Sequence, residues 1–529
     1  MGKKWWRRFA GVSFAAATLM TGCSGKAGDF DATAPQAAGG DASFTASVQS
    51  NGDTAAYYDD VEFNTEEYDS ISESGFASVA QSPLSTFAAD VDTASYSNVR
   101  RMINAGYTAD EIPSGAVRAE EMINYFSYDY NGPEDGEPFG INATIAECPW
   151  NKDNLLLHLG LQTEAIDFSQ AGDSNIVFLI DVSGSMDDAN KLPLLQQSFG
   201  LLVDELGQKD RVSIVTYANG NSIVIEGVPG NEKQTIMDAL NQLRAGGGTN
   251  GGAALKMAYD LAEQYFIEDG NNRVILASDG DWNLGITSQS EMSDLIKKEK
   301  ESGIYLSVLG FGMGNYSDSR MQTLADDGNG NYAYIDSLNE AKKVLVEELG
   351  ANMVTVADDV KLQIEFNPVY VAEYRLIGYE NRRLNAEDFE DDTKDAGEIG
   401  AGHSVTALYE LVPAGEQAEA SDLKYQEASL TEEATESNEW LTLQIRYKAP
   451  GEPDSKLLEY PIGEDCVVDA PEDDFVFSAA VAEFAMLLSD SDYKADAGYD
   501  HILAQIANVD LSDEYRAEFK TLVEAVEQN

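Results

Sequence analysis

The chain has 529 residues, of which 43% are apolar, and 93 acidic side chains against 34 basic ones give a formal net charge of −59. A chain of this length exceeds what one hydrophobic core serves, so roughly two to four domains are expected. A surface so acidic repels nucleic acid, which we therefore exclude as a partner.

The first 22 residues have the layout of an export signal. Basic residues at positions 3, 4, 7 and 8 precede an apolar run over residues 9–20, as in secretory signals. The sequence Met20-Thr21-Gly22-Cys23 resembles a bacterial lipobox. We expect removal of residues 1–22 and lipid attachment at Cys23, which places the protein at a bacterial cell surface or envelope. The alternative is a plain signal peptide that is cleaved near Gly25.

Residues 23–84 are rich in small and acidic residues and contain few large apolar ones, which predicts a disordered tether. Residues 85–135 then show helical periodicity, with Val99, Met102 and Ile103 on one face. A second periodic segment follows with Met122 and Phe126 on its apolar face, and two helices of this length cannot form a domain alone. We therefore expect this N-terminal helical flank to pack on a later part of the chain.

Two strand-like runs follow within residues 140–162. Residues 174–350, which we call the A domain, alternate strands with helices. The predicted strands are residues 176–181, 212–217, 223–225, 274–278, 305–310 and 332–335. This alternation predicts an α/β fold with a doubly wound, mostly parallel sheet that helices cover on both faces.

Residues 352–465 contain strand-like runs without helices between them, and residues 470–529 return to helical periodicity. Because an unpaired sheet edge is a liability, we expect residues 140–162 and 352–465 to form one β-sandwich into which the A domain is inserted. The same sandwich could join Cys148 and Cys466 in a disulfide. Two buried free thiols would look identical in the sequence.

Oxygen-bearing side chains follow strands of the A domain. Asp181, Ser183 and Ser185 follow the first strand, Thr249 follows a run of three glycines, and Asp279 follows a later apolar run. Because ligand sites of α/β sheets lie at the carboxyl edge of the strands, we expect these side chains to meet. Their order and spacing resemble the metal-ion-dependent adhesion site of a von Willebrand factor A domain, which implies a Rossmann-like fold. Taken singly, Asp181, Ser183 and Thr249 could instead cap helices.

This set offers only oxygen ligands, which suits a hard divalent cation and suits zinc poorly. Magnesium is the expected ion, with manganese or calcium as alternatives. The resemblance implies that Ser183, Ser185 and Thr249 ligate directly and that Asp181 and Asp279 act through waters. One coordination position would remain for a partner's carboxylate. The glycine run lacks the lysine of a phosphate-binding loop, so no nucleotide is expected.

Residues 86–101, 120–126 and 477–484 resemble the flanks of a family of bacterial von Willebrand factor A lipoproteins. The resemblance implies an envelope lipoprotein, anchored in the membrane by its lipid, that binds a protein or matrix ligand through its ion. The alternative is an assembly or scaffolding factor of an envelope complex that uses the same site. The three histidines are isolated and no nucleophile motif is present, so we do not expect an enzyme.

Overall fold

The computed structural model describes residues 66–528 except positions 90–91, 135, 166–171, 250, 269, 281–288, 315, 349–353, 395 and 416–429. The chain divides into Met1–Val61 and Glu62–Asn529. Cys23, the expected signal peptide and most of the expected tether lie outside the described residues. In the part of the chain that is described, no helix is long and apolar enough to cross a membrane.

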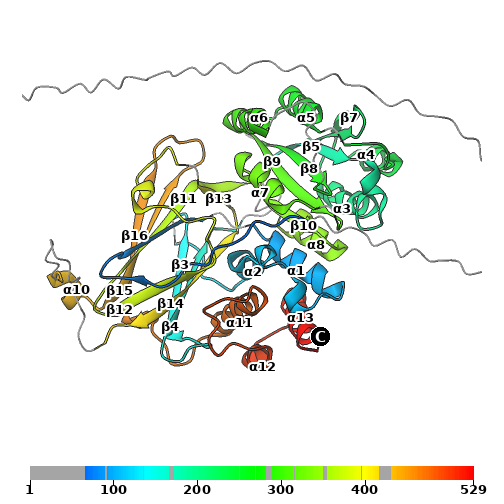
Figure 1. Ribbon diagram of the computed structural model, residues 1–529. Coiled ribbons are helices and arrows are strands. Elements are labelled where there is room, and N and C mark those ends of the chain that lie inside the picture. Colours follow the sequence, from blue (N-terminus) through cyan, green and yellow to red (C-terminus); the bar gives the residue numbers. More distant parts are fainter. Residues whose placement is uncertain are drawn as a thin grey trace, which may run out of the picture. The chain divides into compact units, whose positions relative to one another are not determined.

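The A domain is built on one six-stranded sheet (Figure 1). Its strands are β5 (Ser174–Asp181), β6 (Arg211–Tyr217), β7 (Asn221–Pro229), β8 (Asn271–Ser278), β9 (Ile304–Phe311) and β10 (Tyr332–Ile335). The order is β10-β9-β8-β5-β6-β7, and every pairing is parallel except that of β6 with β7. The predicted mostly parallel sheet is confirmed.

Helices cover both faces of this sheet. They are α3 (Leu192–Glu205), α4 (Lys233–Gln242), α5 (Gly252–Gln264), α6 (Gln289–Glu301), α7 (Asp318–Asp327) and α8 (Leu338–Lys342), which continues as a π-helix over Lys343–Glu347. Alternate residues of β5 point to opposite faces. Phe178 packs with Phe199 of α3, whereas Leu179 packs with Leu255 of α5. The sheet is therefore doubly wound.

A β-sandwich contains strands from both sides of the A domain. One sheet has the order β1-β12-β14-β4-β3, and the other has the order β13-β11-β15-β16 with β2 also paired to β11. The bounds are β1 (Ala77–Ser78), β2 (Leu84–Ala88), β3 (Gly140–Glu147), β4 (Leu155–Gln162), β11 (Thr355–Phe366), β12 (Val371–Ile377), β13 (Gly397–Gly400), β14 (Ser404–Pro413), β15 (Glu439–Lys448) and β16 (Lys456–Gly463). Because β4 pairs with β14 along its length, the A domain is inserted in the sandwich, as predicted.

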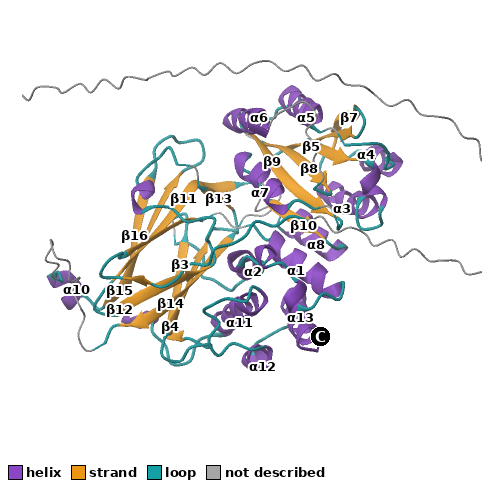
Figure 2. Cartoon of the chain, viewed as in Figure 1, coloured by secondary structure: helices purple, strands orange, loops and turns teal. Residues whose placement is uncertain are grey.

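Among the described residues outside the A domain, five α-helices form one layer on the outer face of the sheet that contains β3 and β4 (Figure 2). They are α1 (Ala94–Asn104), α2 (Ala119–Asn124), α11 (Asp473–Leu488), α12 (Tyr499–Gln505) and α13 (Glu514–Gln528), while the short α10 (Glu432–Glu436) is exposed. Ring centroids of Phe126 and Phe477 lie 4.9 Å apart, and those of Phe477 and Phe519 lie 5.4 Å apart. The N-terminal helices thus pack on the C-terminal ones, which supply the core they lack on their own.

Two expected boundaries are wrong. Residues 66–84 are not part of a disordered tether, because β1 pairs with β12, Val79 is buried and Glu66 forms an ion pair with Arg101 at 3.0 Å. These contacts offset the entropy of ordering a polar segment. The helical flank expected to begin at residue 85 begins instead with β2, which pairs with β11.

Of the two alternatives left open for Cys148 and Cys466, the structure has the free thiols and not the disulfide. Cys148 follows β3 and is buried in the core beneath the helical layer. Cys466 lies in the short helix Glu464–Cys466 and packs against the core between the two sheets. The two thiols thus lie in different cores, and the pairing of their neighbours Ile145 and Val467 does not bring them together.

Buried ion pairs join the helical layer to the A domain. Arg100 of α1 contacts Asp336 at 2.5 Å and Glu340 of α8 at 2.7 Å. Arg118 contacts Asp318 of α7 at 2.6 Å. All five side chains are buried or nearly so. Removing one partner of such a pair leaves an uncompensated buried charge.

We expect Arg100→Met to lower the free energy of unfolding by about 3–5 kcal/mol, because Asp336 and Glu340 lose their buried cation. Urea denaturation measures the effect, and Arg244→Met, at an exposed arginine, is the control. Equal stability of the two variants would contradict a structural role for these ion pairs.

Candidate metal site

Two buried carboxylates lie at the carboxyl edge of the central strands. Asp181 ends β5, and Asp279 directly follows β8, the parallel neighbour of β5. The register pairs Ile180 with Ala277, so the segments that follow β5 and β8 leave the sheet side by side. Both aspartates are 0% exposed. The strands that surround β5 and β8 in the sheet cause this burial.

The two predicted serine ligands face each other in the first loop. Oγ of Ser183 lies 3.0 Å from Oγ of Ser185, and the backbone N–H of Ser183 donates to Oδ1 of Asp181 at 2.8 Å. Ser183 precedes the short helix Gly184–Asp187, but its side chain makes no capping hydrogen bond. The helix-capping alternative therefore does not account for Ser183.

The glycine run brings the loop of Thr249 to the same edge. The N–H of Gly246 donates to the Val182 carbonyl at 2.8 Å, and the N–H of Gly184 donates to the Gly247 carbonyl at 2.9 Å. Gly247 has φ +91°, and a Cβ at this position would lie 2.5 Å from Nδ2 of Asn219. A side chain there would thus displace the loop. Thr249 is half-buried, and the residue at the N-cap of α5 is Gly251 rather than Thr249.

Burial is the main cause of the unusual electrostatics of this edge. Burial and, to a smaller extent, the negative charge of Asp279 raise the pKa of Asp181, the hydrogen bonds from Ser183 and Ser278 lower it, and the net pKa is about 6. A buried carboxylate with a raised pKa is short of compensating positive charge. The edge therefore favours binding of a cation.

Lys191 and Ser278 belong to the site although the sequence did not indicate them. Nζ of Lys191 lies 3.1 Å from Oδ2 of Asp279, and Oγ of Ser278 donates to Oδ2 of Asp181 at 3.2 Å. Ser278 is adjacent to Asp279 and could have been included for that reason. No sequence pattern indicates Lys191, because its contact with Asp279 depends on where α3 begins in space relative to β8.

The donor set fits a hard divalent cation. Two carboxylates and three hydroxyls supply oxygen alone, which such ions prefer. Within the described residues, no group of three or more His, Cys, Asp or Glu side chains is placed to hold a metal.

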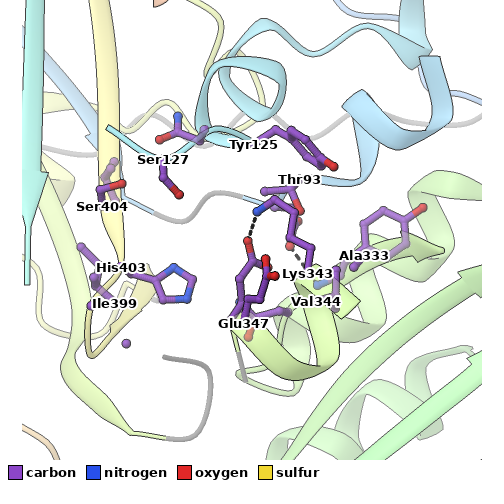
Figure 3. A pocket seen from close by; sticks show the side chains of 18 of the residues that line it. Thr93, Tyr125, Ser127, Ala333, Lys343, Val344, Glu347, Ile399, His403 and Ser404 are labelled. Carbon is purple, nitrogen blue, oxygen red and sulfur yellow. Dashed lines mark hydrogen bonds and ion pairs between the residues drawn. The ribbon is translucent and has the colours of Figure 1, made fainter. Parts of the chain in front are cut away.

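A polar cavity of about 320 Å³ lies elsewhere, around the π-helix that follows α8 (Figure 3). Its lining includes Tyr125, Lys343, Glu348 and His403, and none of the five predicted ligands. Lys343 forms an ion pair with Glu348, and its Nζ lies 4.8 Å from the Tyr125 ring centroid. Because Lys343 pairs with Glu348 and also contacts Tyr125 of the helical layer, we assign these charged groups to holding the A domain against that layer.

Family models match three successive parts of the chain. The model described as von Willebrand factor matches residues 62–158, and that described as von Willebrand factor type A domain matches residues 175–347. The model described as uncharacterized protein YfbK, C-terminal, matches residues 351–528. These matches cover the described body from its first residues to its last helix.

Whole-chain comparison finds similarity to the uncharacterized protein YfbK of Escherichia coli strain K12, with 42% identity over 469 residues, covering 87% of this chain and 81% of that protein. Inter-alpha-trypsin inhibitor heavy chain H3 of Mesocricetus auratus is 27% identical over 175 residues, which cover 31% of this chain and 19% of that protein. A solved von Willebrand factor type A structure from Catenulispora acidiphila is 15% identical, with a TM-score of 0.42, and the match covers 75% of this chain and 91% of that one.

We expect the metal-free protein to lose stability as the pH rises from about 4 to about 7. The pKa of Asp181 in the folded protein, about 6, lies above its ordinary value of 3.8. The folded state therefore holds this proton more tightly, and ionisation favours the unfolded chain. Asp181→Asn should remove the contribution of Asp181 to this dependence and be more stable than wild type at pH 7 by up to about 3 kcal/mol.

Denaturation in the presence of a chelator across this pH range measures the difference between wild type and Asp181→Asn. Asp260→Asn, at an exposed helix position, is the control and should follow wild type. Parallel pH profiles for wild type and Asp181→Asn would show that burial does not perturb Asp181.

Proposed function

Because the chain belongs to a family of bacterial proteins built around a von Willebrand factor type A domain, we propose that it binds a protein or matrix ligand through a divalent ion at the edge of β5 and β8. The observation that carries this proposal is that Asp181, which is buried near the negative charge of Asp279, accepts a hydrogen bond from the N–H of Ser183, whose hydroxyl faces that of Ser185. Interaction with other proteins is the function that such a domain suggests.

Ser183, Ser185 and Thr249 would hold the ion directly, with Asp181 and Asp279 acting through waters. Magnesium suits this small, oxygen-only set, and manganese or calcium are the alternatives. When bound, the ion supplies a coordination position that a carboxylate of the partner can fill. The protein's own charge of −59 would repel such a carboxylate elsewhere on the surface, which restricts its recognition to this site.

We propose a binding protein rather than an enzyme. His158 Nε2 hydrogen-bonds Tyr130 at 2.9 Å, and His501 Nδ1 hydrogen-bonds Glu483 at 2.8 Å. His158 and His501 lie on different elements, and neither contacts the oxygen-donor set. Their contacts support roles in packing.

A scaffolding factor of an envelope complex is the second candidate. The observation in its favour is that the A domain is not an isolated module on a flexible linker. Arg100 and Arg118 bind it to the helical layer through buried ion pairs. A body held together in this way could present the site and the sandwich to two parts of one assembly.

Asp181→Ala should weaken magnesium binding at least tenfold while the sheet stays folded, because the side chain lies at the edge of the sheet rather than within its core. Calorimetry with MgCl₂ measures the affinity, circular dichroism monitors the fold, and Asp260→Ala is the matched control at an exposed aspartate.

The partner is sought by crosslinking on intact cells in magnesium or in EDTA. The proposal expects a partner that wild type retains in magnesium and loses in EDTA, and that Asp181→Ala does not retain. Unchanged magnesium affinity in Asp181→Ala, or a partner held equally by both proteins in EDTA, would refute it.

We also propose that the lipid on Cys23 anchors the protein to a bacterial membrane. Cys23→Ser should move the protein from the membrane fraction to the soluble one and abolish incorporation of labelled fatty acid, because the thiol is the attachment point. Cys466→Ser, at a free thiol in the folded body, should remain in the membrane fraction. Retention of Cys23→Ser in the membrane fraction without label would contradict the anchor.

A further inference from the structure

We propose that Lys191 is a built-in counter-ion that competes with the divalent cation for Asp279 and so weakens binding of that cation. The inference rests on the proposed ion site and adds a residue that determines its affinity. The ammonium is part of the same polypeptide, so its local concentration at Asp279 is fixed by the fold.

The geometry of the ion pair supports this assignment. Nζ of Lys191 lies 3.1 Å from Oδ2 of Asp279, and the two side chains are 5% and 0% exposed. Lysine is rarely buried to this extent unless its charge is matched. The same side chain thus neutralises a carboxylate that the resemblance assigns to the ion.

The path of the lysine stem is also specific. Gly312, directly after β9, has φ +80°, and a Cβ there would lie 2.3 Å from Cε and 2.4 Å from Cγ of Lys191. The Tyr334 hydroxyl donates a hydrogen bond to the Gly312 carbonyl. Any side chain at position 312 would therefore displace the aliphatic part of Lys191. The glycine leaves the space through which this side chain reaches Asp279.

The ammonium also has a second carboxylate within reach. Nζ lies 3.8 Å from Oδ2 of Asp188, which is 65% exposed. A divalent cation beside Asp279 would repel the ammonium, since like charges in a buried setting are poorly screened. Asp188 offers a position nearer the solvent to which the ammonium can move. The ion must displace Lys191 or bind beside it, and either event lowers its affinity.

Lys191 therefore has two opposite effects, one on the stability of the ion-free protein and one on the affinity for the ion. Without the ion, Lys191 stabilises the fold by matching the charge of Asp279. With the ion, it opposes binding. A lysine that merely positioned Asp279 for the ion would instead strengthen binding, so the direction of the change in affinity distinguishes the two roles.

The first experiment titrates the full folded chain with MgCl₂ in a calorimeter, comparing wild type with Lys191→Met, which keeps most of the stem and removes the charge. We expect the variant to bind magnesium at least tenfold more tightly. Lys209→Met, at a lysine that is 79% exposed in the same domain, should match wild type. Unchanged or weaker binding by Lys191→Met would overturn the competition.

The second experiment needs no metal. In EDTA, Lys191→Met should melt at a lower temperature than wild type, because Asp279 loses its buried counter-ion. Adding Asp279→Asn to that variant should recover most of the loss. Equal melting of wild type and Lys191→Met in EDTA would overturn the counter-ion role.

The two experiments separate this inference from the proposed function. Tight magnesium binding by wild type with no gain in Lys191→Met would leave the proposed function intact and refute the competition. Absence of magnesium binding in both proteins would overturn the proposed function and the competition together. The melting experiment then decides the counter-ion role by itself.

Discussion

The antiparallel pairing of β4 with β14 joins a strand that precedes the A domain to one that follows it. It closes the sandwich around the insertion and fixes both ends of the A domain. It also completes the sheet whose outer face supports the helical layer. Leu157 and Leu159 of β4 pack between the two sheets, while Leu156 packs beneath the helices. One strand therefore contributes to two cores, and separating it from β14 would expose both.

The proposed site depends on charge held away from water. Asp181 and Asp279 are buried because central strands of a parallel sheet have neighbours on both sides, and their negative charges oppose each other. Hydrogen bonds from Ser183 and Ser278 satisfy oxygens of Asp181, and Lys191 matches Asp279. The chain thus supplies one cation of its own to an edge that suits a divalent one.

The edge is also connected to the rest of the body. The N–H of Gly314 donates to Oε1 of Glu66 at 2.8 Å, and the N–H of Glu67 donates to the Tyr316 carbonyl at 2.9 Å. A Cβ on Gly280, next to Asp279, would lie 2.7 Å from the N–H nitrogen of Ser317. The first described residues therefore hold the loop that packs beside the candidate site. Together with the ion pairs of Arg100, these contacts make the A domain part of one body rather than an independent module.

The sequence by itself determined the alternation of strands and helices in residues 174–350, the insertion of that domain in a sandwich, and the residue types at the carboxyl edge. It could do so because buried helices and strands repeat their apolar residues at characteristic spacings, and because parallel strands end at a common edge of the sheet. The tertiary structure alone decided the rest. Residues 66–84 are ordered by partners such as β12 and Arg101 that are distant in sequence, and Cys148 and Cys466 remain apart because they pack in different cores. Lys191 reaches Asp279 because α3 begins beside β8 in space, and no local pattern encodes a contact between elements so far apart along the chain.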